Sequence, residues 1–342
     1  MSLLESPLAN ILFIVVSRIG DTLFATPAIR AVAAAHPEAR VSVLGHPRRA
    51  EVFEHLPFVY RVGTITKHRA AWRGWLSGKP FDLCFVFGFD QALVAYALRV
   101  SKRVVAFEQE DTSLNRRLFA AITRPPFQSE HAVLQLLRLP ASVGVAPAAL
   151  RIAFHSTREE TTFARQRLQG AGIGDGQPLV GLQVASFATK SYRDWPIENF
   201  ATLCDRIVSR WPQARFLIYG GSAERQRTDW LKQRLGERAA LFAGSLSLRD
   251  TAALMRLSDL YIGVDTGPTH IMSAFDIPLV ALYHCMSSSK LTGPLEHPCA
   301  YLIDHPTSRE RCTEMSDMAD IRVDTVFAAV EQAIAEHPPG RR

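Results

Sequence analysis

Continuous runs of hydrophobic residues, each about as long as a strand, recur along the first half of the chain. The first run, Ile11–Val16, is rich in β-branched residues, and a turn containing Gly20 and a helical stretch from Thr22 follow it. A strand that is hydrophobic along its whole length is typical of a parallel sheet covered by helices. The pattern therefore predicts a doubly wound α/β domain. Further strands of this half are predicted at Val41–Leu44, Leu83–Phe87 and Arg103–Phe107.

The second half of the chain repeats the alternation of strands and helices. Strands are predicted there at Leu179–Val184, Arg215–Tyr219, Leu260–Val264 and Leu279–Tyr283. Between the two halves, several glycines interrupt the pattern within Leu168–Pro178. We therefore expect two α/β domains, residues 1–170 and 171–342, with ligands bound at the carboxyl ends of the parallel strands.

The segment Asp265-Thr266-Gly267-Pro268 has the sequence of a turn between a strand and a helix. Gly267 tolerates positive φ, and Pro268 suits the first turn of a helix because its missing N–H would have no partner there. Backbone N–H groups at such a helix start can bind a phosphate, and Asp265 and His270 flank them. The alternative is an ordinary turn in which Asp265 only caps the helix, which is predicted at Thr269–Phe275.

Asp21 follows the first predicted strand directly. Only one glycine lies in this turn, whereas the dinucleotide-binding motif needs three, which argues against a nicotinamide site. Asp21 is either a capping residue of the next helix or a carboxylate held at the open end of the sheet.

Two further groups of polar residues follow strands of the second half. Lys190 and Arg193 lie in the polar loop Ser186–Trp195, where cations suit a diphosphate, although a solvated loop is the simpler interpretation. Glu224 follows the Gly220-Gly221 turn, where a carboxylate either accepts hydrogen bonds from ribose hydroxyls or caps the next helix.

Charge is divided unevenly between the halves. Residues 1–170 carry a net charge of +8 and residues 171–342 a net charge of −2, so the first half is expected to face an anionic partner. No nucleic-acid-binding motif is present, and nucleic acid is not expected as a partner. No hydrophobic run approaches the ~20 residues that cross a bilayer, and the N-terminal residues lack a signal-peptide pattern.

The five cysteines contain no C-x-x-C pair, which predicts free thiols in a reducing cytosol. His284, Cys285, His297 and Cys299 are close in sequence, but their spacing fits no common zinc site. No metal or cofactor is therefore expected, and we expect a cytoplasmic protein.

Several motifs together carry a resemblance that runs over nearly the whole chain. They are Ser17-Arg18-Ile19-Gly20-Asp21, Phe81-Asp82-Leu83, Glu130-His131-Ala132-Val133, Arg193-Asp194-Trp195-Pro196, the Tyr219–Arg225 segment, Asp265-Thr266-Gly267-Pro268 with His270, and Thr292-Gly293-Pro294. In their order and spacing the chain resembles the ADP-heptose:lipopolysaccharide heptosyltransferase family, glycosyltransferase family nine. One segment departs from the pattern, since His284–Ser289 replaces the Gly-Pro-Thr-type turn usual in similar proteins.

The resemblance implies a GT-B fold, in which two Rossmann-like domains face a central cleft. The N-terminal domain would bind the acceptor and the C-terminal domain the nucleotide sugar, while the last helix, Asp324–Glu336, would pack back onto the N-terminal domain. The implied reaction is inverting and metal-independent transfer of heptose from ADP-heptose to a hydroxyl of the lipopolysaccharide inner core, with Asp21 as the base. The residues expected to bind the nucleotide sugar are Ser186, Lys190, Arg193, Glu224, Asp265, Thr266, Gly267 and His270.

The expected acceptor is phosphorylated lipid A carrying its core, reached at the cytoplasmic face of the inner membrane. Candidate acceptor-binding residues are Arg18, Arg69 and Arg73. The segment 67–76, if helical, sets Trp72 and Trp75 beside these cations, a combination favoured at lipid headgroups. The alternative is that both tryptophans pack into the N-terminal core.

Two rival functions remain open. One is a GT-B transferase that uses another nucleotide sugar, a hexose or an N-acetylhexosamine, because the turn at His284–Ser289 is altered. The other is a non-catalytic binding protein with the same fold, against which the presence of Asp21 argues.

Overall fold

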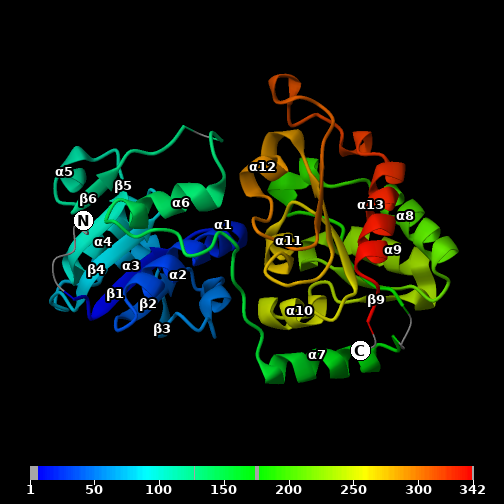
Figure 1. The fold of residues 1–342 in the computed structure, drawn as a ribbon, viewed down its shortest axis with the longest axis horizontal. Coiled ribbons are helices and arrows are strands. Elements are labelled where there is room, and N and C mark those ends of the chain that lie inside the picture. Colours follow the sequence, from blue (N-terminus) through cyan, green and yellow to red (C-terminus); the bar gives the residue numbers. More distant parts are fainter. Residues whose placement is uncertain (1–6, 127, 174–176, 341–342) are drawn as a thin grey trace. The chain divides into compact units, whose positions relative to one another are not determined.

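The computed structural model describes residues 7–126, 128–173 and 177–340, and the chain forms two compact units (Figure 1). The units are Met1–His155 and Ser156–Arg342, so the division lies before the glycine-interrupted segment at which the sequence analysis places it. Helix α7 (Arg158–Gly170) explains the difference. It lies beside α10 (Leu248–Met255), and the buried guanidinium of Arg249 pairs with Glu160 across the two helices.

The first unit is built on a six-stranded sheet in the order β3-β2-β1-β4-β5-β6, with every neighbouring pair parallel. Its strands are β1 (Asn10–Val15), β2 (Arg40–Gly45), β3 (Arg61–Thr64), β4 (Phe81–Phe87), β5 (Ser101–Phe107) and β6 (Ala120–Ile122). The hydrophobic run of β1 is buried from Ile11 to Val15, as expected for a strand covered on both faces. Its neighbours β2 and β4 continue this core.

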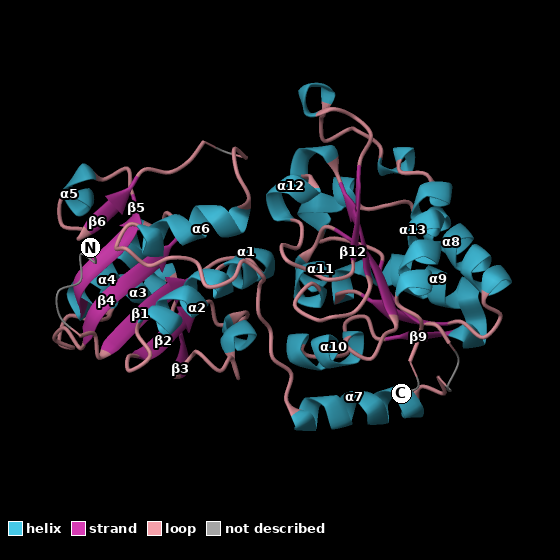
Figure 2. Cartoon of the chain, viewed as in Figure 1, coloured by secondary structure: helices cyan, strands magenta, loops and turns pink. Residues whose placement is uncertain are grey.

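Helices connect these strands and flank the sheet (Figure 2). They are α1 (Ile19–Phe24), α2 (Thr26–Ala35), η1 (Ala50–Phe53), α3 (Lys67–Trp72), α4 (Gln91–Val100), α5 (Thr112–Asn115) and α6 (Ala132–Ala141). Helix α4 has a regular start, because the side chain of Asp90 accepts hydrogen bonds from the backbone N–H groups of Ala92 and Leu93. It packs its buried face against β4 and β5.

The second unit holds a second six-stranded parallel sheet, in the order β12-β11-β10-β7-β8-β9. Its strands are β7 (Leu179–Gln183), β8 (Arg215–Tyr219), β9 (Ala239–Leu241), β10 (Leu260–Val264), β11 (Leu279–Tyr283) and β12 (Ala300–Asp304). Strands β7, β10 and β11 are buried at every position. These three adjacent strands form the centre of the unit.

The helices of the second unit surround this sheet. Besides α7 and α10 they are η2 (Ala188–Arg193), α8 (Ile197–Arg210), η3 (Ser222–Glu224), α9 (Arg225–Leu235), η4 (Gly236–Arg238), α11 (Gly267–Met272), η5 (Cys285–Ser287), α12 (Ser289–Thr292), η6 (Arg309–Arg311), η7 (Met318–Asp320) and α13 (Val323–Glu336). Helix α13 packs on α8 and on strands β10 to β12, and its Val326 and Val330 are fully buried in that core. The helix that the resemblance places on the N-terminal domain therefore belongs to the core of the second unit.

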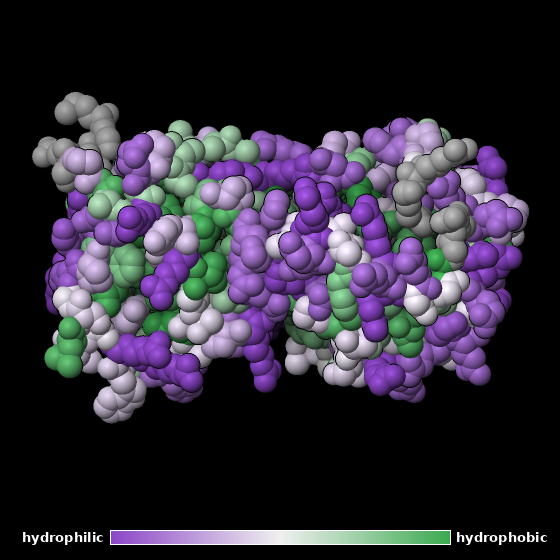
Figure 3. Space-filling model, turned by 90° about the horizontal axis from the view of Figure 1, so that it is seen from below, coloured by the Kyte–Doolittle hydropathy of each residue, from purple (hydrophilic) through white to green (hydrophobic). Residues whose placement is uncertain are grey.

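On the face drawn in Figure 3 most residues are hydrophilic, and hydrophobic residues show as patches among them. Among the described residues, none of the helices combines the length and the hydrophobicity that a membrane span requires. The largest exposed hydrophobic side chains of the first unit include Trp72, Trp75 and Leu76.

Candidate functional site

Most of the expected nucleotide-sugar residues lie at the carboxyl edge of the second sheet. Strand β10 lies between β7 and β11, and all three run parallel. The loops that follow them therefore emerge side by side. The loop after β7 carries Arg193, the loop after β10 carries Asp265, and the loop after β11 carries Ser287. This edge is where open parallel sheets bind ligands.

The carboxylate of Asp265 is the centre of this group. Its Oδ2 accepts hydrogen bonds from Arg193 Nη1 at 2.7 Å and from the hydroxyl of Ser287 at 2.6 Å, and His270 Nε2 lies 3.2 Å from Oδ1. Burial alone would raise the pKa of Asp265, but the hydrogen bond and charge of His270, together with Arg193 and Ser287, lower it overall. Asp265 is thus a buried carboxylate held in its ionised form.

Helix α11 starts close against strand β10. A Cβ at Gly263 would lie 2.7 Å from Thr269 Oγ1, so glycine is needed there for the helix to approach. The same hydroxyl donates a hydrogen bond to the carbonyl of Val264. The helix is short and ends at Met272, earlier than the sequence pattern suggests, but it presents Thr266, Gly267 and His270 at the sheet edge as expected.

The loop after β7 is held by hydrogen bonds of its own. The hydroxyl of Ser186 donates to the carbonyl of Lys190 and to the carboxylate of Asp194. The ammonium of Lys190 lies 3.2 Å from the hydroxyl of Tyr192 and 5.1 Å from the centre of its ring. Ser186 thus shapes the loop that carries Lys190 and Arg193, and this loop follows one of the three central strands.

Glu224 lies after β8, one strand further along the sheet. Its Oε2 accepts a hydrogen bond of 2.5 Å from the backbone N–H of Gly221. The carboxylate therefore closes its own turn, which is the capping role that the sequence analysis left open. Its negative charge also contributes to the raised pKa of Asp194, after the larger effect of burial.

The turn after β11 adds residues that the sequence analysis did not assign to the site. Ser287 contacts Asp265, and the ring of His284 meets that of Tyr192 edge-on, with centres 4.9 Å apart. Ser287 has no motif of its own, and only the adjacency of β10 and β11 reveals its role. The altered segment His284–Ser289 is therefore part of the candidate donor site.

A disulfide joins Cys285 to Cys312, so the expectation of free thiols is wrong for this pair. The two residues are far apart in sequence and come together because the chain after β12 returns over the end of β11. There the ring of His284 lies 3.1 Å from the carbonyl of Ser316. The remaining cysteines, Cys84, Cys204 and Cys299, are buried.

In the part of the chain that the structure describes, one group of potential metal ligands stands out. His284, Cys285 and Cys312 place their ligand atoms within 4.8 Å of one another. The two sulfurs are bonded to each other, and Nδ1 of His284 accepts the N–H of Met286. The oxidised group therefore does not present thiolate ligands.

In the first unit, Asp21 lies in the first turn of α1, just beyond the carboxyl end of β1. Its Oδ2 accepts a hydrogen bond of 2.8 Å from the hydroxyl of Ser17, and both the carboxylate and the neighbouring Arg18 are exposed. An exposed carboxylate at this edge is accessible to a substrate hydroxyl.

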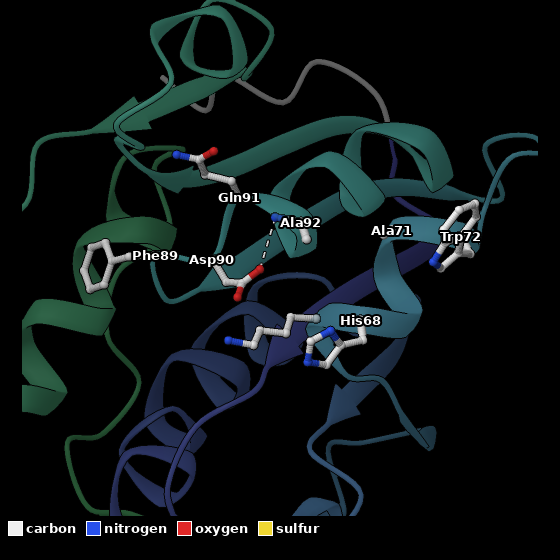
Figure 4. Close-up of a pocket in the computed structure, with 8 residues that line it drawn as sticks. His68, Ala71, Trp72, Phe89, Asp90, Gln91 and Ala92 are labelled. Carbon is white, nitrogen blue, oxygen red and sulfur yellow. Dashed lines mark hydrogen bonds between the residues drawn. The ribbon is translucent and has the colours of Figure 1, made fainter.

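A cavity of about 600 Å³ lies between α3 and the start of α4 (Figure 4). It is lined by Lys67, His68, Ala71, Trp72, Phe89, Asp90, Gln91 and Ala92. His68 and Asp90 come from the two facing elements, and Asp90 follows β4, the neighbour of β1. The cavity therefore opens at the same edge of the sheet as Asp21.

The basic, tryptophan-containing segment is only partly helical. Helix α3 ends at Trp72, and Gly74 adopts φ +85°, so Trp75 lies beyond the helix. Both tryptophans are exposed, which makes the alternative of core packing wrong. The indole of Trp75 lies under the guanidinium of Arg99, 4.7 Å from its ring centre, while Arg69 and Arg73 remain exposed.

Two six-stranded parallel sheets with flanking helices give the chain the GT-B fold. A family model described as glycosyltransferase family 9 (heptosyltransferase) matches residues 88–320, and the chain belongs to this family. It is thus a glycosyltransferase.

Similar proteins and solved structures cover most of the chain. The chain is 22% identical over 340 residues to lipopolysaccharide heptosyltransferase 3 of Escherichia coli, covering 94% of this chain and 98% of that protein. Among solved structures it is similar to a family 9 glycosyltransferase of Veillonella parvula, with TM-score 0.83, 18% identity and coverage of 96% and 98%. It is also similar to the E. coli ADP-heptose lps heptosyltransferase II, with TM-score 0.81, 17% identity and coverage of 96% and 100%.

Proposed function

We propose that this enzyme transfers a heptosyl group from ADP-heptose to a hydroxyl of the lipopolysaccharide inner core. The observation that carries the proposal is the group around Asp265 at the carboxyl edge of the second sheet, in a chain of the heptosyltransferase family. Similar proteins include lipopolysaccharide heptosyltransferases, one of which is named for ADP-heptose.

In the proposed reaction, Asp21 takes the proton of the acceptor hydroxyl. The oxygen attacks the anomeric carbon of heptose from the side opposite to ADP, which inverts the configuration as the bond to the diphosphate breaks. A well-placed base of this kind contributes about 10²–10⁴-fold to the rate. Ser17 orients the carboxylate through its 2.8 Å hydrogen bond.

Residues of the second unit would bind the donor. Lys190 supplies a cation for the leaving diphosphate, and Arg193 does so while it also holds Asp265. Thr266, Gly267 and His270 would contact the sugar or its phosphates. Ser186 would hold the loop that carries Lys190, through its hydrogen bond to the Lys190 carbonyl. Glu224 would accept a hydrogen bond from a ribose hydroxyl with its Oε1, while its Oε2 accepts the N–H of Gly221.

With these cations the proposed reaction proceeds without a divalent metal. The acceptor would be phosphorylated lipid A with its core, bound by the first unit, and Arg18, Arg69 and Arg73 are the candidate contacts. The exposed Trp72, on the same segment as Arg69 and Arg73, supports a peripheral contact with the cytoplasmic face of the inner membrane.

Activity assays with a panel of donors test the proposal. The enzyme should transfer heptose from ADP-heptose to a lipopolysaccharide core acceptor, and the rate should persist in a metal chelator. Nuclear magnetic resonance of the product should show an inverted anomeric centre. Transfer only from a hexose or N-acetylhexosamine nucleotide would favour the alternative donor, which the altered turn at His284–Ser289 keeps in view.

Lys190→Ala tests donor binding separately from folding. Because Lys190 is not buried, its removal should leave stability unchanged and weaken ADP binding about tenfold or more in calorimetry. Lys232→Ala, which removes a lysine of α9 that is half-buried like Lys190, is the matched control. Equal ADP affinity in the two variants would contradict the diphosphate role of Lys190.

A further inference from the structure

A second basic segment lies beside the turn that carries Asp21. Strands β1 and β2 are parallel neighbours, with Val15 opposite Gly45, so the loops that follow them lie side by side. The second loop contains Arg48 and Arg49, which the sequence motifs do not single out.

Arg49 is bonded to the Asp21 turn. Its Nη1 donates a 2.8 Å hydrogen bond to the carbonyl of Ser17, and the hydroxyl of Ser17 in turn donates to Asp21 at 2.8 Å. The loop after β2 folds back tightly onto the end of its own strand, because a Cβ at Gly45 would lie 2.9 Å from the backbone of Ala50. Arg49 therefore occupies a defined position next to the proposed base.

Positive charges gather there and act on one another. Burial, and then the charges of Arg18 and Arg48, lower the pKa of the Arg49 guanidinium, and only Asp21 acts in the opposite direction. Burial, and then the charges of Arg49 and Arg48, lower the pKa of His46 as well. Within the described residues, neither Arg48 nor Arg49 forms an ion pair with a carboxylate. An added anion would relieve this repulsion.

We infer that Arg18, Arg48 and Arg49 form a binding site for an oxyanion of the acceptor, a carboxylate or a phosphate, next to the hydroxyl that Asp21 deprotonates. Guanidinium groups suit this role because their planar N–H donors match the oxygens of both anions. The inference rests on the proposed function and specifies its substrate class. The site selects acidic acceptors and positions their reacting hydroxyl at Asp21.

Topology favours these arginines over those of α3 for this role. Arg48 and Arg49 follow β2, the direct neighbour of β1, whereas α3 follows β3 at the edge of the sheet. Arg69 and Arg73 are therefore assigned to a more distant part of the acceptor or to the membrane surface.

The test uses Arg48→Gln, because Arg48 is exposed and its loss should not disturb the fold. We expect the KM for the acceptor to rise about tenfold or more, as for the loss of a hydrogen bond to a charged group, while kcat and the affinity for ADP stay unchanged. Arg48→Lys should recover part of the loss because it keeps the charge. Arg61→Gln is the matched control, because Arg61 is an exposed arginine at the amino end of β3, away from the carboxyl edge that carries Asp21.

Modified acceptors identify the anion. An acceptor whose carboxylates are reduced to alcohols and an acceptor without phosphates are each compared with the intact acceptor. The modification that removes the bound anion should raise the acceptor KM of the wild-type enzyme. With that modified acceptor, Arg48→Gln should have the same KM as the wild type. If Arg48→Gln has the same acceptor KM as Arg61→Gln, the oxyanion site is wrong.

Direct binding separates this inference from the proposed function. Calorimetry of the acceptor on wild type and Arg48→Gln, without donor, needs no turnover. Weaker binding to Arg48→Gln supports the oxyanion site even when the wild type transfers no heptose, an outcome that would overturn only the proposed reaction. Equal binding, together with normal heptose transfer, overturns only the oxyanion site.

Discussion

At the scale of single residues, Asp265 illustrates how a buried charge is maintained. Its side chain is 1% exposed, and water cannot compensate its charge. Arg193, His270 and Ser287 replace the lost hydration, and each comes from a loop or helix after one of three adjacent strands. The carboxylate thus connects these loops and helps to keep their other side chains in position for a ligand.

Asp265→Asn should lower the free energy of unfolding by about 3 kcal/mol at neutral pH, because it leaves Arg193 without its partner in a largely buried place. The folded pKa of Asp265 is below its ordinary value of 3.8, so its contribution is complete above that pH and is lost as the pH falls further. Urea unfolding of both proteins at pH 7 and below pH 4 should show the difference shrinking in acid. Asp205→Asn, which breaks an exposed ion pair, should show no comparable loss, and a similar loss there would contradict the argument.

Asp21→Asn should reduce kcat by two orders of magnitude or more, because the amide cannot accept the proton of the acceptor hydroxyl. The amide oxygen can still accept the hydrogen bond from Ser17, so the turn should be preserved. Steady-state kinetics and ADP calorimetry on the same preparation check this. Near-normal turnover with unchanged ADP affinity would mean that another group is the base.

The residues of the candidate site differ in how far sequence could predict them. Asp265 and His270 stand in a motif directly after a hydrophobic strand, so their place at the sheet edge follows from the pattern. Ser287 and Arg49 have no such signal, since serines and arginines in loops are usually solvated. Their roles depend on which strands are neighbours, and strand order is a property of the whole sheet.

At the scale of elements, the interior strands were predictable and the edge strands were not. The sequence pattern predicts the eight interior strands of the two sheets, while β3, β6, β9 and β12 are the four edges. An edge strand has only one neighbour and is partly exposed, so it lacks a continuous hydrophobic run. Strand β12, for example, has no buried residue.

The disulfide between Cys285 and Cys312 closes a loop across 27 residues, which corresponds to about 3.5 kcal/mol of stabilisation in the chain-entropy account. Cys312→Ser should lose about this much in urea unfolding without reductant. Dithiothreitol should have the same effect on the wild type and no effect on the variant. Alkylation of Cys285 and Cys312 in the unreduced native enzyme would show that the bond is absent.

The same bond should support donor binding. Cys285 is two residues before Ser287, which binds Asp265, and His284 contacts Tyr192 in the loop of Lys190. Reduction should therefore weaken ADP binding by a small factor, about twofold to fivefold, while the acceptor affinity stays the same. Calorimetry with and without dithiothreitol measures this, and Cys312→Ser serves as the control because reductant should not change it.

At the scale of the whole molecule, charge and exposed hydrophobic area are concentrated in the first half of the chain. Residues 1–170 carry the net positive charge, and this half contains Trp72 at 86% exposure and Leu76 at 101%. Moving large hydrophobic side chains such as these out of water is favourable in free energy. Beside Arg69 and Arg73, they form a surface suited to an anionic membrane.

Two pairs of substitutions separate the contributions to membrane binding. Arg69→Glu with Arg73→Glu should weaken binding to anionic liposomes about tenfold or more at low salt, since each cation contributes about 1 kcal/mol, and the effect should fade as salt is raised. Trp72→Ala with Leu76→Ala should weaken binding to a similar degree at every salt concentration, because burial of hydrophobic area is not screened. Met315→Ala, which removes an 89% exposed side chain of the second unit, is the control. If liposome sedimentation shows no change in either pair relative to this control, while ADP affinity is intact, the surface around α3 does not bind the membrane and its arginines act on the acceptor alone.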